Sequence, residues 1–339
     1  MAPQPLPHPV ALSRRLRVHA RWFVLTLTSL LIICLSLSTV FASFEELPTG
    51  GRAAGLGNAF TGIADDVYSI YYNPAGLVQL HRSEFTAYYS KLYAGLSDGS
   101  SIGRSFVAYA HPMKTRGTFG ISYLSLSLAD LYSESTVALS YAHALGMKWN
   151  LGGNLKFLRK SFGSDTYTQN AINSDTGAPL GGADPLFAQN GSSKSGMAVD
   201  LGAQYRLSRI YGIGITILNM NSPNMALSSD DSDPVSAVYK VGLARRTKTS
   251  AVDAEFSMQK FTQEEFRLNI GGERWFGNGL GVRGGLGFGQ RGYQLTSIGF
   301  AYRWESLQVD YALIYPLSGI KGTFGTHQVS MTFRFGRRS

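Results

Sequence analysis

From about residue 83 to residue 335, the chain alternates apolar and polar residues with a period of two. The pattern is clear in QVSMTFRF (328–335), YKVGLA (239–244) and VDLGAQYR (199–206). Successive side chains of a β-strand point to opposite faces, so each segment has one apolar and one polar face. Strands of this kind suit a half-solvated sheet or a barrel that is embedded in lipid.

Fourteen such stretches can be counted, an even number, as in single-chain outer-membrane barrels. The connections after even-numbered stretches are short, whereas the two longest, 162–194 and 220–234, both follow odd-numbered stretches. Because outer-membrane barrels have short periplasmic turns and longer extracellular loops, both long connections are predicted to be extracellular. The predicted strands cover residues 83–95, 103–113, 116–128, 133–145, 148–161, 195–207, 211–219, 235–246, 249–261, 264–276, 279–290, 294–303, 306–316 and 326–335.

The first 42 residues read as a targeting segment. They contain no acidic residue, carry four arginines between positions 14 and 21, run apolar over 22–40 and end in the small residue Ala42. These features predict a signal peptide (1–42) and export to the outer membrane of a Gram-negative-type envelope. The alternative is an uncleaved membrane anchor, since the apolar run is long enough to span a bilayer. The only cysteine, Cys34, lies in this segment, so the rest of the chain has no thiol chemistry.

Charge and composition exclude several classes of function. The net charge is +9, but four of the 31 basic residues and none of the 22 acidic ones lie in the predicted signal peptide, so the basicity does not indicate a nucleic-acid partner. Asp230, Asp231 and Asp233 lack the glycine and distal glutamate of a calcium-binding EF-hand loop, and neither metal nor cofactor is expected. No enzymatic activity is expected, although a hydrolase triad assembled across strands stays open as an alternative.

The segment before the first predicted strand differs from the rest of the chain. It contains NAFTGIADDVYSIYYNPAGL (58–77), in which Asp65 and Asp66 suit the start of a helix and Asn73-Pro74 its end. Because this segment precedes the wall, it is predicted to form a small helical hatch in the lumen. The predicted organisation is a signal peptide (1–42), hatch (43–82), transmembrane barrel (83–335) and tail (336–339). The alternative is a packed segment that only fills the lumen.

The sequence GRAAGLGNAFTGIADDVYSIYYNPAGL (51–77) resembles the N-terminal signature shared by FadL-type transporters of hydrophobic compounds and PorV/PorQ-type outer-membrane proteins. Both are fourteen-stranded barrels with an N-terminal hatch. The similarity continues more weakly through LGGNLKFL, AVDLGAQYRL and HQVSMTFRFG, and the short chain is closer to the PorV/PorQ branch. The residues that carry the signature are Arg52, Gly57, Ala59, Phe60, Asp65, Asp66, Tyr72, Asn73, Pro74, Ala75 and Gly76.

The FadL-type resemblance implies passage of hydrophobic small molecules across the outer membrane, with movement of the hatch around residues 73–75 as the release step. The alternative is a PorV/PorQ-like, non-enzymatic component of a type IX-like secretion or surface-attachment system. The implied partners are outer-membrane lipid and either a hydrophobic ligand or a secretion-system or cargo protein. The implied hatch and gating residues are Arg52, Asp65, Asp66, Asn73, Pro74, Ala75 and Gly76.

Two further sets of residues are candidates. Apolar residues on the long loops would capture a ligand, or would simply pack on their own loops: Leu180, Leu186, Phe187, Met220, Met225 and Leu227. Charged residues that alternation directs into the lumen are expected to pair with one another and with the hatch, Lys156 with Asp200 in particular. They are Lys156, Asp200, Arg206, Lys240, Asp253, Glu255, Arg267, Glu273, Arg283, Arg303, Asp310 and Arg334. A polar anion channel is the alternative, which a hatch disfavours.

Overall fold

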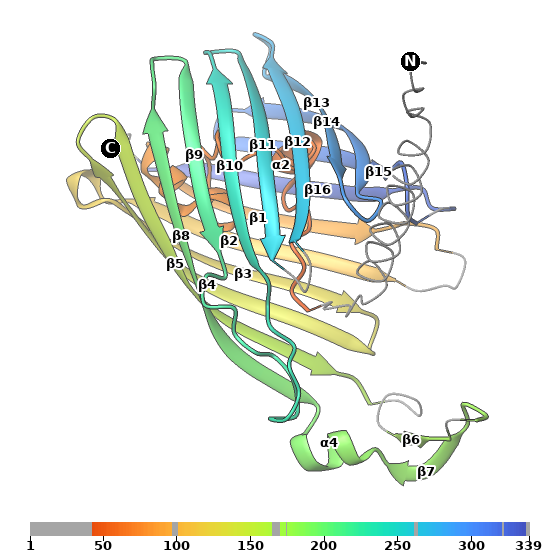
Figure 1. The fold of residues 1–339 in the computed structure, drawn as a ribbon. Coiled ribbons are helices and arrows are strands. Elements are labelled where there is room, and N and C mark those ends of the chain that lie inside the picture. Colours follow the sequence, from red (N-terminus) through yellow and green to blue (C-terminus); the bar gives the residue numbers. More distant parts are fainter. Residues whose placement is uncertain are drawn as a thin grey trace, which may run out of the picture. The chain divides into compact units, whose positions relative to one another are not determined.

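The structure, a computed structural model, describes residues 43–96, 101–164, 170–173, 175–260, 264–320 and 322–336. The predicted signal peptide (1–42), with its cysteine, and residues 337–339 of the predicted tail lie outside these ranges. Fourteen antiparallel strands close into one barrel, because β1 pairs with both β2 and β16 (Figure 1). The predicted antiparallel barrel of fourteen strands is therefore confirmed. No helix in the described ranges is long and apolar enough to cross a membrane.

The wall strands follow one another around the barrel in chain order, with β8 next to β5. They are β1 (Ser83–Leu92), β2 (Ile102–Pro112), β3 (Thr118–Leu128), β4 (Tyr132–Leu145), β5 (Trp149–Phe162), β8 (Ser193–Arg206), β9 (Tyr211–Leu218), β10 (Ala237–Arg246), β11 (Ser250–Lys260), β12 (Glu264–Trp275), β13 (Leu280–Gly289), β14 (Gln294–Trp304), β15 (Leu307–Pro316) and β16 (Thr326–Phe335).

The two faces of the wall differ as the alternation predicts. In β16, Val329 and Met331 expose 49% and 52% of their surface on the outside, whereas Gln328 and Ser330 are buried in the lumen. Exposed aromatic residues stand near both rims, for example Trp304 at the short-turn end. An apolar outer band bordered by aromatic residues is typical of barrels in the outer membrane.

The connections are sorted between the two ends of the barrel. Every even-to-odd connection in wall order is a short turn, and the one after β2 contains the 3-10 helix η2 (Lys114–Arg116). The connection from β5 to β8, which the sequence pattern treats as loop, instead contains the strand pair β6 (Asn170–Ile172) and β7 (Pro179–Ala183), followed by α4 (Pro185–Asn190). Short turns mark the periplasmic end of an outer-membrane barrel, so α4 lies at the extracellular end.

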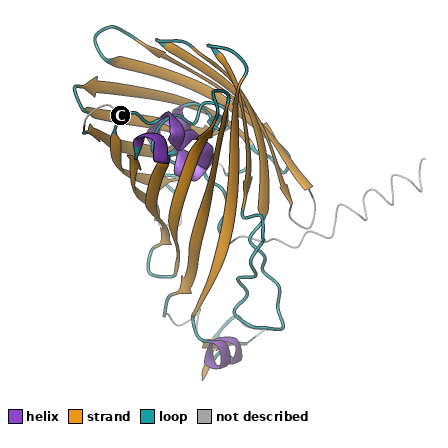
Figure 2. Ribbon diagram, turned by 90° about the vertical axis from the view of Figure 1, so that its left-hand side faces the viewer, coloured by secondary structure: helices purple, strands orange, loops and turns teal. Residues whose placement is uncertain are grey.

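Residues 43–82, which we call the hatch, contain α2 (Gly51–Gly55), α3 (Ser69–Tyr72) and the 3-10 helix η1 (Pro74–Gln79). Figure 2 shows these short helices inside the barrel, away from α4. Their apolar side chains form the largest buried cluster of the described chain, together with residues of the wall.

The expected helix beginning at Asp65 and Asp66 is wrong in its bounds, because α3 starts only at Ser69. The physical reason is that both carboxylates bind the guanidinium of Arg52, and only Asp66 also accepts a hydrogen bond from the following backbone, at Tyr68 N–H (2.9 Å). The predicted end is close, since α3 stops at Tyr72, but the next proline opens η1.

The inner wall carries glycines at several places where the hatch lies against it. A Cβ atom on Gly271 would lie 2.0 Å from the carbonyl oxygen of Leu56, and one on Gly214 would lie 2.1 Å from that of Thr61. Only glycine permits such close approach of two backbones. We call this set the glycine belt. At Gly152, Gly214, Gly242, Gly271 and Gly285 the Cβ atom would meet the hatch backbone, and at Gly202 it would meet the side chains of Asn73 and Pro74.

Candidate functional site in the barrel lumen

Arg52 of α2 joins the hatch to the wall. Its guanidinium lies 2.5 Å from Asp65 and 2.8 Å from Asp66 within the hatch, and 2.5 Å from Glu273 of β12. Glu273 in turn pairs with Arg283 of β13 at 3.1 Å. Removing one member of a buried ion network leaves an uncompensated charge, so each contact fixes how the hatch is seated.

The two aspartates of this network have opposite pKa shifts. Burial raises the pKa of Asp66 to about 6, opposed by Arg52 and reinforced by Asp65 and by Glu84 of β1. Burial also acts to raise the pKa of Asp65, but the ion pairs with Arg52 and Arg246 outweigh it and lower that pKa to about 2. One carboxylate therefore stays ionised, while the other takes up a proton just below neutral pH.

Wall carboxylates accept hydrogen bonds from the irregular part of the hatch. Glu255 Oε2 accepts from the N–H groups of Phe60 (3.2 Å) and Thr61 (2.9 Å). Asp253 Oδ2 does the same for the next two N–H groups, at 2.9 and 3.1 Å. Buried backbone N–H groups without a hydrogen-bond partner are costly. The carboxylates of β11 thus provide partners for four N–H groups that lie outside the hatch helices.

The Asn73-Pro74-Ala75-Gly76 turn packs against β5 and β8. Asn73 Nδ2 donates to the carbonyl oxygens of Thr61 and Ala203, both at 3.2 Å, and its Oδ1 accepts from Ala75 N–H. Gly76 is required locally, because a Cβ atom there would lie 2.0 Å from the carbonyl oxygen of Ala64. The turn predicted as a gate is therefore bonded both to the rest of the hatch and to the wall.

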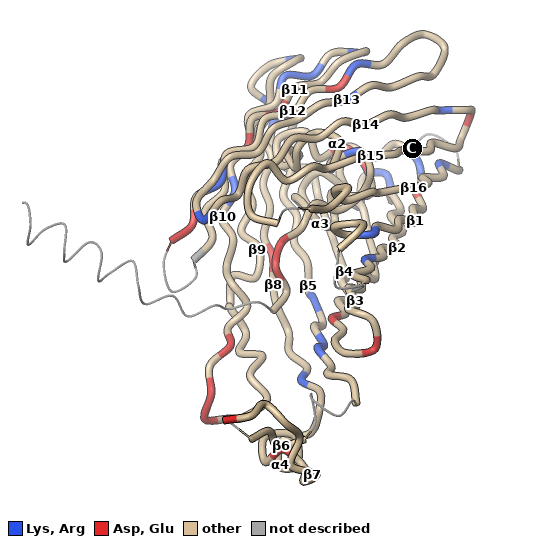
Figure 3. The backbone as a smooth tube through the Cα atoms, turned by 90° about the vertical axis from the view of Figure 1, so that its right-hand side faces the viewer, with Lys and Arg blue, Asp and Glu red and all other residues tan. Residues whose placement is uncertain are grey.

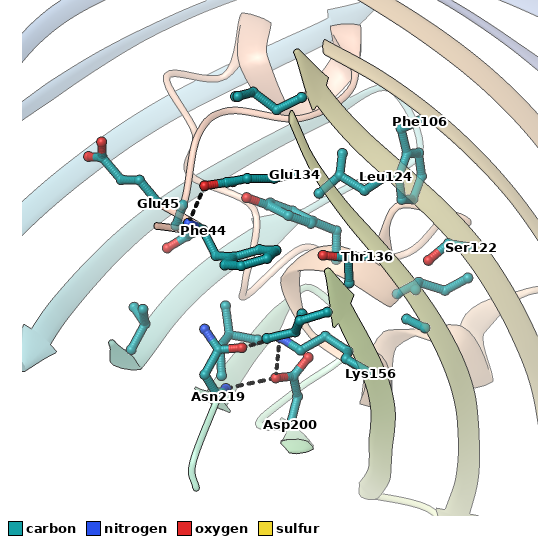
Figure 4. A pocket seen from close by; sticks show the side chains of 18 of the residues that line it. Phe44, Glu45, Phe106, Ser122, Leu124, Glu134, Thr136, Lys156, Asp200 and Asn219 are labelled. Carbon is teal, nitrogen blue, oxygen red and sulfur yellow. Dashed lines mark hydrogen bonds and ion pairs between the residues drawn. The ribbon is translucent and has the colours of Figure 1, made fainter. Parts of the chain in front are cut away.

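A pocket of about 80 Å³ lies on the extracellular side of the hatch. Figure 4 shows its lining, which combines apolar side chains of the wall with Phe44 of the N-terminal segment. On one side Lys156 contacts Asp200 at 2.7 Å and hydrogen-bonds to Asn219, and on the other Glu134 accepts from Phe44 N–H at 2.8 Å. A pocket of this size holds several waters or a molecule of a few carbon atoms.

Arg104 of β2 places a positive charge at the wall of this pocket. Its side chain is 3% exposed and donates to Leu47 O (2.8 Å) and Tyr71 Oη (3.1 Å), while its Nε has no partner. Among the described residues no carboxylate lies within ion-pair distance of Arg104. Likewise, no basic side chain lies within ion-pair distance of the nearby buried Glu134. A buried guanidinium without an anion is a candidate ligand-binding group.

The predicted lumen-facing charges point inward, and most of them pair. The Lys156–Asp200 pair that the sequence predicts is present at 2.7 Å. Arg206, Asp253 and Arg303 form no ion pair within the described ranges; Arg206 is exposed, Asp253 accepts from hatch N–H groups, and Arg303 binds the side chain of Gln308. The other pairs are Lys240–Glu255 (3.3 Å), Lys240–Glu46, Arg267–Glu45 (3.0 Å), Arg283–Asp310 (2.6 Å) and Arg334–Glu84 (2.7 Å).

The predicted capture residues of the long loops do not converge on one surface. Leu180 on β7 is exposed, Leu186 and Phe187 lie on α4, and the ring of Phe187 packs on that of Phe162. Met220 is exposed and Leu227 half-buried, whereas Met225 is fully buried against Leu158 and Ala198 of the wall. Only Met225 therefore reaches the lumen.

Sequence reasoning missed Arg104, Glu134 and Glu84. Alternation alone could have found Glu84, which shares its face of β1 with Thr86 and Ser90. Arg104 is harder to assign, because β2 has apolar residues on both faces, with Phe106 buried inside and Val107 exposed outside. Within the described ranges no group of histidines, cysteines and carboxylates could hold a metal ion.

The closed antiparallel barrel, with its apolar outer face, defines a class, the outer-membrane β-barrels. The model of the PorP/SprF family, described as a type IX secretion system membrane protein, matches residues 68–333, and the chain belongs to this family. The predicted localisation in the outer membrane is confirmed by the barrel and the family together. No curated protein matches the sequence.

Solved structures support the fold. The CymD monoaromatic hydrocarbon channel is 14% identical, with a TM-score of 0.61 over 88% of this chain and 100% of that chain. The Pseudomonas putida toluene transporter TodX is 11% identical, with a TM-score of 0.61 over 86% and 100%. A Pseudomonas aeruginosa FadL homologue is 14% identical, with a TM-score of 0.57 over 87% and 100%. Both resemblances seen in the sequence are thus supported, and neither group is described as an enzyme.

Proposed function

We propose that the protein is a non-enzymatic component of the type IX secretion system that works as a plugged barrel. The observation that carries this proposal is the close contact between the hatch and the wall. Backbone meets backbone along the glycine belt, and Arg52 ties both parts into one buried ion network. A lumen filled in this way suits a protein that engages partners through its loops and rims rather than one that conducts polypeptide through its centre.

A second candidate function is passage of small hydrophobic molecules, as in the hydrocarbon channels of the same fold. The observation in its favour is the mostly apolar pocket beside Arg104. Such a pocket suits a small hydrophobic molecule with one polar or anionic group, which would supply the partner that the guanidinium lacks. Release would then require movement of the hatch around residues 73–75, which we propose as the gate for this function only.

Deletion and complementation in the native cell separate the two functions. We would delete the gene, restore it with the wild-type chain or with Arg104→Leu, and measure the secreted and surface proteins together with uptake of a radiolabelled small aromatic carboxylate such as benzoate. The secretion role predicts that deletion removes specific secreted or surface proteins and that Arg104→Leu restores them. The transport role predicts that deletion slows uptake and that Arg104→Leu does not restore it. Unchanged secretion after deletion would refute the first proposal.

A further inference from the structure

The periplasmic end of the barrel is strongly basic. Its six short turns and the strand residues beside them expose nine basic side chains, but among the described residues there the only exposed acidic one is Glu305. Acidic residues instead gather in the extracellular loops, such as 230–233 near α4 (Figure 3). The basic residues are Lys114, Arg116, Lys148, Arg206, Arg209, Arg245, Lys248, Arg274 and Arg303.

Part of this basic rim faces the inside of the barrel. A cavity of about 530 Å³ opens beneath the hatch and is lined by Arg303, Lys248 and Trp275 among others. The guanidinium of Arg303 stacks 4.1 Å from the ring centroid of Trp275 and, in the described chain, has no carboxylate partner. Asp65, Asp66, Glu84 and Glu273 of the lining all pair with arginines. Of the lining arginines, Arg52, Arg246 and Arg334 are paired in this way, whereas Arg82 and Arg303 have no ion pair among the described residues. Arg303 is therefore a cation available to a ligand.

A second, smaller cavity of about 70 Å³ lies on the same side of the hatch, between β5, β8, β9 and β10. Its lining contains Lys148, Arg206, Arg209 and Arg246 and no acidic residue. Of these four, only Arg246 has an ion-pair partner among the described residues, Asp65. The basic groups therefore extend under the hatch from β8 to β14, a span that a single small anion cannot cover.

The direction in which the basic side chains point distinguishes two possible ligands, lipid headgroups and an acidic polypeptide. Arg245 and Arg274 share the outward face of their strands with Leu243 and Ile270, so phosphate groups of lipid can reach them. Arg206 and Arg303 continue the inward face, and the bilayer cannot reach that side. Arg206 and Arg303 line two separate cavities on this side of the hatch, and exposed inward cations without carboxylate partners match a flexible, negatively charged polypeptide.

We propose that the periplasmic face of the barrel, centred on the cavities beneath the hatch, docks an acidic segment of a periplasmic protein. Arg303 and Arg206 supply the free positive charge, and Trp275 supplies an aromatic face beside it. This inference goes beyond the secretion role, because it names the face and the chemistry of the partner.

The test uses the full mature chain in nanodiscs of phosphatidylcholine, which expose both rims and carry no anionic lipid. The probe is a fluorescent peptide of alternating Glu and Ser, with a matched peptide of Gln and Ser as control, measured by anisotropy at low and physiological salt. The test variant is Arg206→Gln/Arg303→Gln. The matched control is Arg245→Gln/Arg274→Gln, which removes the same charge from the outer side of the same rim. Heat-modifiable gel mobility checks that all variants are folded.

The acidic peptide is expected to bind and the Gln peptide is not. The inward variant is expected to weaken binding about tenfold, the sum of two exposed ion pairs, with no change in the outward variant. Equal losses in both variants, or equal binding of the two peptides, would overturn the proposal. Native-membrane preparations in which phosphatidylglycerol co-purifies and is lost only with Arg206→Gln/Arg303→Gln would overturn it too, by assigning these arginines to lipid.

Discussion

Substitution of Gly271 by Ala tests the contact between the backbones of hatch and wall. The new Cβ atom would lie 2.0 Å from the carbonyl oxygen of Leu56, a separation that side chains do not tolerate. One of the two backbones must move by at least about 1 Å, because Cβ atoms essentially never approach other heavy atoms within 3.0 Å. The hatch cannot easily retreat, since the Arg52–Glu273 ion pair ties it to the same strand, β12.

The neighbouring residue provides a matched control. Gly272 faces the other side of β12, where an added Cβ atom would lie 3.7 Å from Val252 Cγ2 and 3.8 Å from the carbonyl oxygen of Ala251, both ordinary contacts. Both changes are Gly to Ala in the same strand, so their effects on the entropy of the unfolded chain cancel. Overpacking of a buried contact costs about 1–3 kcal/mol, and this cost is expected for Gly271→Ala but not for Gly272→Ala.

Thiol labelling measures this difference. Outside residues 1–42 the chain has no cysteine, so Thr61→Cys places a single thiol in the buried part of the hatch, at a hydroxyl without a hydrogen-bond partner. A loss of about 1–3 kcal/mol in hatch stability raises its labelling rate about fivefold to a hundredfold. If the two alanine variants label at the same rate while both barrels stay folded, the close approach of the two backbones is refuted.

Four further results are expected. Because the pKa of Asp66 is raised to about 6, its ionised form is disfavoured in the fold, and thermal stability should rise as the pH falls from 7 to 5; Asp66→Asn should reduce that rise. Because the pKa of Asp65 is lowered to about 2, stability should then fall between pH 4 and pH 2, which a flat melting profile would contradict. Asn73→Ala/Pro74→Ala should loosen the hatch without unfolding the barrel, and it should stop toluene uptake if the turn is a gate; normal uptake would exclude gating. Arg104→Leu should weaken an anionic amphiphile about tenfold or more and leave neutral hydrocarbons unchanged, as read by fluorescence titration.

The wall of the barrel was predictable because its rules are local. A period of two assigns each side chain to lipid or lumen, and the length of a connection assigns it to one end. The same rule predicted the Lys156–Asp200 pair, since both residues face inward on strands that the structure places side by side. The connection between β5 and β8 was less predictable, because two strands of three and five residues carry too few positions for a pattern.

The seating of the hatch depends on contacts between residues far apart in sequence. In the local sequence Asp65 and Asp66 resemble residues at the start of a helix. Only the fold shows that both carboxylates form ion pairs with Arg52. Glu255 and Asp253 read as ordinary inward charges, although their oxygens serve backbone N–H groups almost two hundred residues away. No periodicity in either segment indicates the partner, because each contact is defined by closure of the barrel.

The glycine belt changes what gating by this hatch can mean. A glycine in a strand weakens it and contributes no side chain to the core, so six of them on the inner wall are costly unless the space they leave is used. Here the hatch backbone fills that space, and wall carboxylates satisfy its N–H groups. Expulsion of the whole hatch would open these contacts and the Arg52 network together. Passage of a small molecule therefore breaks fewer contacts if it needs only a local change at the Asn73 turn or in the extracellular loops, with the rest of the hatch kept in place.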